Sequence, residues 1–241
     1  MKSDHGRMVR QGEGSLWLHA TIDVEVVSFR LDAGPATVRA SAAVLAEDER
    51  ERARRFVCDH ARRRFIIARA RLRRLLAARL AVRPESVALV YGKHGKPALA
   101  PALADSGLRF NLSHAGDFAV YAFSTSGEVG VDIEQVRAIQ DADQVAAHAF
   151  SRRENECYRN LDARRRPLAF FRCWTRKEAF VKALGAGLSY PLGGFDVSLA
   201  PAEAARILRV GRTPGDRCGW TLRSFVPGPG LTGAVVHGAG E

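Results

Sequence analysis

The chain has 241 residues, of which 46% are hydrophobic and 26% charged. This globular composition excludes an intrinsically disordered protein, and no apolar run approaches the roughly 20 residues that a membrane-spanning helix needs. A formal net charge of +11 favours an anionic partner, which could be nucleic acid, a nucleotide cofactor or an acidic protein.

The first half alternates between extended and helical patterns. Residues 1–15 lack the apolar core of a signal peptide and predict a flexible start. Residues 16–29 are rich in β-branched and aromatic side chains and predict an extended segment. A short charged helix is expected at 46–56 and a longer one at 60–81, with Asp59 as its cap. Three further strands are expected, at 87–91, 108–112 and 118–124.

The second half repeats this course. A strand is expected at 129–134, and helices follow at about 141–149, 151–162 and 168–184. The chain then ends in strand-like FDVSL, WTLRSF and GAVVHG. Because helices and antiparallel strands are segregated in this way, we predict an α+β fold with an N-terminal half at 1–126 and a C-terminal half at 127–241.

The cysteines indicate the compartment. The four residues have neither a CxxC motif nor the spacing of a disulfide framework, and they lie at Cys58, Cys157, Cys173 and Cys218. Scattered cysteines of this kind are typical of reduced thiols in a cytoplasmic protein.

Strict alternation over 129–134 places two carboxylates on one strand face. Asp132 and Glu134 share that face with Gly130, roughly 6–7 Å apart, while the valines and Ile133 point the other way. A solvated sheet edge would also carry such a pair. However, Gly130 is expected to leave the face open, and a strand this apolar is expected to be central. Two acids there need a cation between them, and oxygen ligands without nearby His or Cys select Mg²⁺.

The helix at 173–187 carries a glutamate on its hydrophobic face. Glu178 lies four residues after Trp174 and three before Val181, where a carboxylate loses hydration. It is either an edge salt bridge with Lys182, or the third oxygen ligand of the metal site. In the second case Lys182, one turn further on, could reach the phosphates of a ligand bound to the metal.

Two turns offer further anion contacts. The segment FNLSHAG at 110–116 ends a strand, and Ser113 and His114 could bind a phosphate through hydroxyl and imidazole. A turn with a capping serine is the alternative, whereas adjacent residues on a strand point apart and do not form a nucleophilic dyad. Lys96 lies in a Gly-Lys-Pro turn and is a second candidate.

Taken together these segments resemble the 4′-phosphopantetheinyl transferases, specifically the larger monomeric type that activates peptide and polyketide synthetases in secondary metabolism. The matching segments are GKP at 95–97, FNLSH at 110–114, GVDIE at 130–134, WTRKEAFVK at 174–182 and GAGLS at 185–189. The Asp-x-Glu strand combined with the Trp-x-x-Lys-Glu helix is specific as a set.

The resemblance implies a Mg²⁺-dependent reaction, with Mn²⁺ as an alternative metal. The phosphopantetheine arm of coenzyme A moves to a serine of an apo carrier protein, and adenosine 3′,5′-bisphosphate is released. It also implies two pseudo-symmetric α+β halves, the active site at their junction, and a monomer. With the cysteine pattern, we expect a cytoplasmic protein that binds neither nucleic acid nor membrane.

The resemblance further implies roles for individual residues. The metal ligands would be Asp132, Glu134 and Glu178. Coenzyme A phosphates would be held by Lys182, Lys96, Ser113 and His114, with Arg64 and, less directly, Arg52 aligned through the Arg-Arg-Phe segment at 54–56. The carrier serine would lose its proton to Glu178 or, as second choice, to Glu154.

Two other functions share part of these features. A Mg²⁺-dependent phosphohydrolase or nuclease would also use clustered acids and a lysine, but with water as the acceptor. A basic nucleic-acid-binding module would explain the positive charge but not the paired acids. The chain also lacks an aromatic-rich strand on which bases could stack, since aromatic residues make up only 8%.

Overall fold

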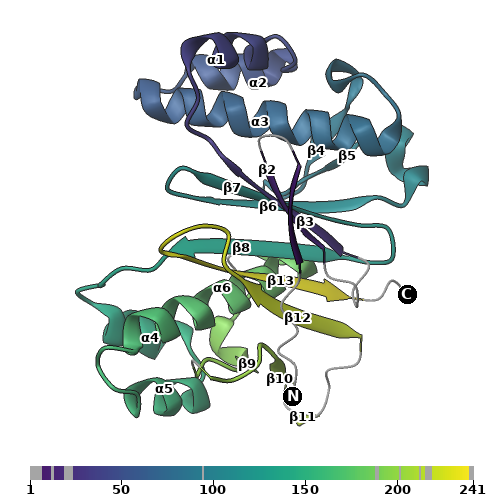
Figure 1. The fold of residues 1–241 in the computed structure, drawn as a ribbon. Coiled ribbons are helices and arrows are strands. Elements are labelled where there is room, and N and C mark those ends of the chain that lie inside the picture. The colour runs from purple at the N-terminus through teal and green to yellow at the C-terminus, as the bar shows by residue number, and fades with distance from the viewer. Residues whose placement is uncertain are drawn as a thin grey trace.

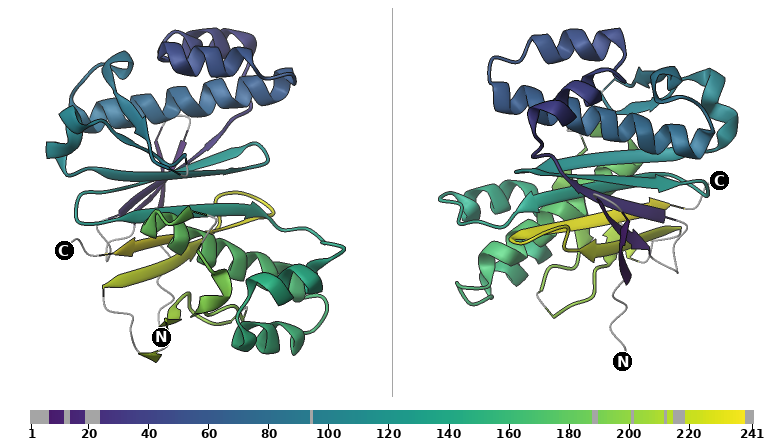
Figure 2. Two further views of the ribbon diagram at one scale, coloured as in Figure 1. Left: turned by 180° about the vertical axis from the view of Figure 1, so that it is seen from behind. Right: turned by 45° about the horizontal axis from the view of Figure 1, so that its top comes forward.

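A computed structural model of the protein describes residues 7–11, 14–18, 24–93, 95–187, 190–200, 202–211, 213–214 and 219–238. Helices and antiparallel strands are segregated in each half, so the fold is α+β, as the sequence predicts. Two sheets lie face to face between two helical layers, which gives the order helix, sheet, sheet, helix (Figures 1 and 2).

The first half is built on a five-stranded antiparallel sheet in the order β1-β2-β3-β7-β6. Its strands are β1 (Arg7–Gln11), β2 (Gly14–Leu18), β3 (Val24–Arg30), β6 (Arg109–Ala115) and β7 (Phe118–Ser124). Helix α3 (Asp59–Leu80) covers one face of this sheet because its Leu72 and Leu76 pack with Tyr121. Outside α3 lie α1 (Pro35–Ala42) and α2 (Glu47–Arg54), with a hairpin of β4 (Leu89–Tyr91) and β5 (Pro97–Leu99) at one end (Figure 1).

The second half is built on a three-stranded antiparallel sheet in the order β12-β13-β8. Its strands are β8 (Val129–Gln135), β12 (Trp220–Phe225) and β13 (Leu231–Gly238). The long helix α6 (Arg166–Leu184) covers the outer face of this sheet. Around α6 lie α4 (Ala142–Ala149), α5 (Arg152–Arg159) and a small sheet of β9 (Phe195–Val197), β10 (Ile207–Val210) and β11 (Thr213–Pro214).

The two halves repeat one arrangement, which is the pseudo-symmetry that the resemblance implies. Each has a strand, then a long helix, then a hairpin whose second strand pairs with the first strand. In the first half these are β3, α3 and β6–β7, and in the second half they are β8, α6 and β12–β13. The division at residue 126 stays a prediction; the chain passes from β7 to β8 through residues 125–128.

A cluster of apolar side chains joins the two sheets, separate from the core of each half. Val131 and Ile133 of β8 pack with Val120 and Ala122 of β7. Since side chains alternate along a strand, this fixes Asp132 and Glu134 on the opposite face, toward α6. The alternation predicted over 129–134 is therefore confirmed.

Several local expectations differ from the structure. Helix α1 has no counterpart in the sequence prediction. Strand β8 is not central: within the described strands it is the edge of its sheet. Strand β1 falls within the stretch 1–15 expected to be a flexible start, whereas β2 begins there and continues into the extended segment predicted from residue 16. Residues 1–6, 12–13, Leu188, Ser189 and Cys218 lie outside the described residues. No helix in the described part of the chain is long and apolar enough to cross a membrane.

Candidate active site

The site begins where α6 crosses β8. A Cβ atom added to Gly130 would lie 2.0 Å from the carbonyl oxygen of Ala179 and 2.3 Å from the amide nitrogen of Ala183. Only glycine therefore lets the helix backbone lie directly on the strand. The face at Gly130 is filled by α6 and is not open, which corrects the expectation from the sequence. This close approach carries Glu178 and Lys182 over the strand that holds Asp132.

Three polar side chains from three elements meet at this crossing. The ammonium nitrogen of Lys182 lies 2.7 Å from Oδ1 of Asp132 and 3.3 Å from Oγ of Ser113. The hydroxyl of Ser113 donates to the same Oδ1 at 2.9 Å. Lys182 also donates to the carbonyl oxygen of Val131, at 3.3 Å. The structure thus brings together β6, β8 and α6 at the junction of the two halves.

The positive charge of Lys182 compensates the carboxylates of the site only in part. Asp132 is 5% exposed, and its Oδ2 has no hydrogen-bond partner within the described part of the chain. Burial raises the pKa of Glu134, and the nearby Asp132 raises it further. Burial and then Asp132 likewise raise the pKa of Glu178. Three carboxyl groups this close together, two of them with raised pKa values, form an environment that a cation would stabilise.

This environment is not a preassembled metal centre. Among the described residues no group of three His, Cys, Asp or Glu side chains is arranged to hold a metal ion. One reason lies in the contacts of Asp132, whose Oδ1 is taken by Lys182 and Ser113. The donor set nevertheless fits a hard cation, because the buried Oδ2 of Asp132 is unsatisfied and all three candidate ligands are carboxylates.

A cavity of about 450 Å³ opens beside this cluster. Its walls come from the β4–β5 turn, β6 and the end of α6: Gly95, Lys96, Pro97, Asn111, Leu112, Glu178, Val181, Lys182, Gly185 and Gly187. The ammonium of Lys96 donates to the carbonyl oxygen of Lys182 at 2.7 Å and lies 3.6 Å from Glu128. Desolvation lowers the pKa of Lys96, against the opposing effect of Glu128.

An imidazole and a guanidinium border the site on the side of α3. His114 follows Ser113 but lies on the opposite face of β6, and as a residue it is exposed. Partial desolvation of its imidazole lowers its pKa, and the charges of Arg64 and Lys182 lower it further. Arg64 itself lies 3.7 Å from Asp117. The structure therefore gathers Arg64, His114 and Lys182 in one electropositive neighbourhood, as an anion site requires.

Comparisons with known proteins agree with this geometry. Residues 128–225 match the model of the 4′-phosphopantetheinyl transferase superfamily, and residues 33–126 match that of the 4′-phosphopantetheinyl transferase N-terminal domain. The chain is 35% identical to the 4′-phosphopantetheinyl transferase HetI of Nostoc sp. over 214 residues, 89% of this chain and 87% of that protein. The chain belongs to the 4′-phosphopantetheinyl transferase superfamily.

Other relatives cover less of the transferase. The 4′-phosphopantetheinyl transferase AcpT of Salmonella typhi is 40% identical over 128 residues, which is 53% of this chain and 63% of that protein. The crystal structure of Thermotoga maritima holo-(acyl-carrier-protein) synthase matches 48% of this chain and 65% of its own, at 18% identity and a TM-score of 0.35. A likeness that weak adds nothing to the assignment.

Glu154 of the transferase lies in a different environment from the one that a proton acceptor needs. It is 1% exposed, and its carboxylate accepts hydrogen bonds from the backbone N–H groups of Val197 and Ser151, both at 2.7 Å. The ammonium of Lys177 lies 2.8 Å away. With both oxygens satisfied and no access to solvent, Glu154 holds the fold together. The structure therefore argues against it as the second candidate base.

Arg52 also lies apart from the cluster in the contacts that the structure records. Its guanidinium stands over the ring of Phe65, 5.2 Å from the ring centroid, on the exposed surface of α2. No contact among the described residues links it to Ser113, His114 or Lys182. A role in binding coenzyme A stays a prediction for this residue.

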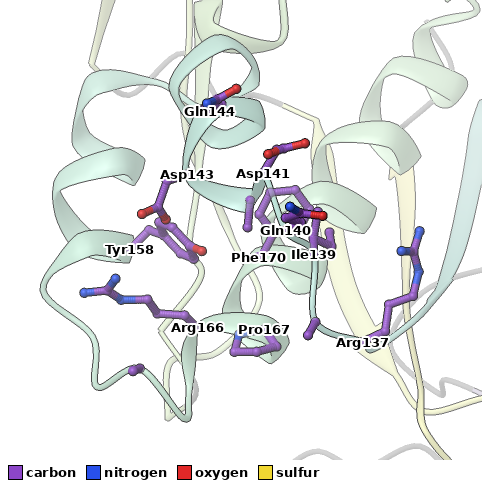
Figure 3. A pocket seen from close by; sticks show the side chains of 13 residues that line it. Arg137, Ile139, Gln140, Asp141, Asp143, Gln144, Tyr158, Arg166, Pro167 and Phe170 are labelled. Carbon is purple, nitrogen blue, oxygen red and sulfur yellow. The ribbon is translucent and has the colours of Figure 1, made fainter.

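Three features were not predicted from the sequence: two polar residues at the site and a separate cavity. Asn111 was not assigned a function, although its side chain contacts β8, and Glu128 pairs with both Lys96 and Arg109. A second cavity of about 330 Å³ was also not anticipated; Arg137 stands at one side and Tyr158, Asp143 and Arg166 at the other (Figure 3). Arg137 is near enough to lower the pKa of Glu134. None of the predicted site residues lines this second cavity.

Proposed function

We propose that this transferase moves the 4′-phosphopantetheine arm of coenzyme A to a serine of an apo acyl or peptidyl carrier protein. The serine oxygen forms a bond to the phosphorus that carries the pantetheine. The bond from that phosphorus to the bridging oxygen breaks, and adenosine 3′,5′-bisphosphate leaves with this oxygen. The family membership supports the reaction class, and the site supports the residue roles.

The observation that carries the proposal is the buried carboxylate of Asp132 with its unsatisfied Oδ2. A water-excluded acid beside two further acids and a lysine is suited to a cation and a polyanion together. Asp132, Glu134 and Glu178 would hold Mg²⁺, or Mn²⁺ in its place. When bound, the metal would neutralise charge on the pyrophosphate of coenzyme A.

The phosphates of coenzyme A would be held by the chain's own cations. Lys182 and Lys96 line the same cavity as Glu178, and Lys182 would stabilise charge on the leaving phosphate. Arg64 and His114 lie in the same electropositive neighbourhood and would hold a further phosphate. Arg52 would contact a phosphate of coenzyme A only if a movement of α2, or the way the ligand extends, brings the two together.

We assign the proton acceptor to Glu178. Its carboxylate is half-buried and lines the cavity next to Lys182, where a phosphate and an incoming hydroxyl would meet. The serine proton would pass to this carboxylate as the new phosphorus–oxygen bond forms. Replacing Glu178 with Gln should abolish turnover while coenzyme A binding remains measurable by calorimetry; normal turnover would refute the assignment.

The partner would be an acidic carrier protein. A net charge of +11 favours association with an acidic surface, and such association weakens as salt screens the charges. The Michaelis constant for the carrier should therefore rise between low and high salt. An unchanged value would contradict electrostatic attraction between the enzyme and the carrier. We further propose that the enzyme acts as a cytoplasmic monomer, with Cys58, Cys157 and Cys173 as free thiols.

Intact-protein mass spectrometry tests the reaction directly. An apo carrier protein incubated with the enzyme, coenzyme A and Mg²⁺ should gain the mass of one phosphopantetheine, and a chelator should abolish the gain. No gain on fatty-acid, polyketide and peptide carriers, with the enzyme folded, would refute the proposal. Release of coenzyme A fragments without a carrier would instead indicate a phosphohydrolase, and chelator-resistant DNA retention a nucleic-acid binder.

A further inference from the structure

Lys96 is linked to three other elements where the two halves meet. It directly precedes β5 in the hairpin, and its ammonium donates at 2.7 Å to the carbonyl oxygen of Lys182 in the last turn of α6. The same ammonium lies 3.6 Å from Oε2 of Glu128, in the segment between β7 and β8. Arg109 of β6 donates to the other oxygen of Glu128, Oε1, at 3.1 Å. Two cations therefore share one carboxylate.

Lys96 also separates two cavities. The cavity beside the acid cluster and a flanking cavity, each of about 450 Å³, both have Lys96 and Gly185 in their walls. Glu178 lines the first of them, whereas Glu128 and Arg109 line the flanking one. The attraction of Glu128 therefore draws the ammonium toward the flanking cavity, away from the cavity in which we place the phosphates of coenzyme A.

The two contacts of Lys96 differ in whether a bound phosphate could coexist with them. A lysine ammonium has three donors, and the carbonyl oxygen of Lys182 uses one, so two remain for a phosphate. The carboxylate of Glu128, in contrast, would repel a phosphate on the same ammonium. Desolvation lowers the pKa of Lys96 and Glu128 opposes this effect, as a phosphate in its place would. An exchange of Glu128 for a phosphate thus keeps Lys96 charged.

Arg109 limits the cost of this exchange. When Lys96 turns to a phosphate, Arg109 remains beside Glu128 and keeps its carboxylate paired. The side chains of Arg109 and Glu128 are 50% and 49% exposed, so water also solvates the released carboxylate. An ion pair this exposed is weak, and a phosphate can displace it.

We propose that Glu128 is a positioning residue that holds Lys96 away from the cavity until a phosphate of coenzyme A displaces it. This role rests on the proposed function, in which Lys96 is a ligand of coenzyme A. In the free enzyme Glu128 lowers the affinity for coenzyme A, because its attraction for Lys96 must be overcome before the phosphate is bound. Arg109 has the opposite effect, since it shares the carboxylate and weakens its hold on Lys96.

Two variants of this network should change coenzyme A affinity in opposite directions. Glu128→Gln releases Lys96 and should strengthen coenzyme A binding about two- to fivefold, the ratio that corresponds to one exposed ion pair. Arg109→Gln leaves Glu128 to Lys96 alone and should weaken coenzyme A binding by a similar factor. Dissociation constants are measured by calorimetry on the full chain with a chelator present, and melting temperatures check that each variant is folded.

A double-mutant cycle separates this role from a general change of charge near the ligand. In the background of Lys96→Met, which lacks the ammonium, Glu128→Gln should leave coenzyme A affinity unchanged, because no lysine remains to be released. A general effect of the lost carboxylate would instead give the same gain in both backgrounds. Lys96→Gln replaces Lys96→Met in the cycle if Lys96→Met lowers the melting temperature.

The carrier assay gives a second measurement. Glu128→Gln should lower the Michaelis constant for coenzyme A and leave the Michaelis constant for the carrier unchanged, whereas damage to the fold would impair both. Failure of Glu128→Gln to strengthen coenzyme A binding, or an equal gain in the two backgrounds, would overturn the inference.

A further outcome concerns Lys96 itself. If Lys96→Met binds coenzyme A as tightly as the original enzyme, Lys96 is not a ligand and the role of Glu128 is refuted with it, while modification of a carrier would still support the transferase reaction. If the original enzyme neither binds coenzyme A nor modifies a carrier, the proposed function itself is refuted.

Discussion

Helix α6 carries two lysines that pair with carboxylates in contrasting ways. Lys177 and Glu154 are 0% and 1% exposed at the side chain, and their charged atoms lie 2.8 Å apart. Lys182 and Asp132 lie 2.7 Å apart, with side chains 29% and 7% exposed. The two lysines are five residues apart on this helix, about 140° around its axis, so they project into different surroundings.

The difference lies in how completely each pair is satisfied. Lys177 also donates to the carbonyl oxygens of Leu192 and Phe195, and both oxygens of Glu154 have partners. Asp132 instead keeps one buried oxygen unpartnered within the described residues. A saturated buried pair has no remaining capacity and stabilises the fold, whereas an unsaturated one at a cavity can still bind a ligand.

The largest expected effect comes from breaking the saturated pair. Glu154→Ala leaves the Lys177 ammonium buried without its counter-charge, which should cost about 3–5 kcal/mol of unfolding free energy. Urea unfolding followed by circular dichroism measures this loss. A loss below about 1 kcal/mol would contradict a structural role. The double variant Glu154→Gln/Lys177→Met should recover part of the loss, since no buried charge remains.

The converse pattern is expected at the unsaturated pair. Asp132→Asn keeps the size of the side chain and removes its charge, so carrier modification should fall by about 10²- to 10³-fold, as for loss of one preorganised electrostatic group. Unfolding free energy should change by much less than in Glu154→Ala. Mass spectrometry of the carrier and urea unfolding give the two values. A variant that loses stability and keeps activity would reverse the assignment of the two pairs.

An intermediate loss of stability and activity is expected when α6, which carries both lysines, is displaced from β8. Gly130→Ala forces a Cβ into the backbone of α6 at Ala179 and Ala183, and overpacking of this kind typically costs about 1–3 kcal/mol. Because α6 carries both lysines, stability and activity should fall together. The nearby Gly185, where an added Cβ meets nothing within 4 Å, is not a clean control because its φ of 66° favours glycine. Gly34, with open space and an ordinary φ, is the matched control.

The sequence predicts the parts of this comparison that depend on local pattern. Alternation over 129–134 correctly separates Asp132 and Glu134 from the apolar face, because a strand has a fixed period of two. The spacing of Glu178 and Lys182 likewise places them on adjoining turns of α6. These inferences need no knowledge of the rest of the chain.

The parts that fail depend on distant partners. Lys177 and Glu154 are 23 residues apart and meet only after α5 and α6 pack, so sequence alone could not distinguish Glu154 from a site acid. Ser113 contacts Asp132 across two sheets. Gly130 suggested an open face because a missing side chain does not reveal which backbone approaches it.

The smallest expected effect is on the free energy of unfolding, through the ionisation of Glu178 in the site. In the enzyme without metal, burial and Asp132 raise the pKa of Glu178 above its ordinary value of 4.5. The folded chain therefore holds this proton more tightly than the unfolded chain does. Between the ordinary and the raised pKa, unfolding free energy falls as pH increases. At neutral pH the ionised carboxylate destabilises the fold, whereas below the ordinary pKa it is protonated in both states.

Glu178→Gln should therefore be more stable than the original enzyme at pH 7, and the difference should shrink as pH falls toward 4. Melting temperatures across this range, with a chelator present, measure the effect; each kcal/mol corresponds to about 2–4 °C in Tm for a chain of this size. Glu156→Gln is the control, because Glu156 is an exposed partner of Arg152 on α5. A Glu178→Gln variant less stable than the original enzyme at pH 7 would contradict this prediction and would mean that the Glu178 carboxylate is already satisfied in the folded chain.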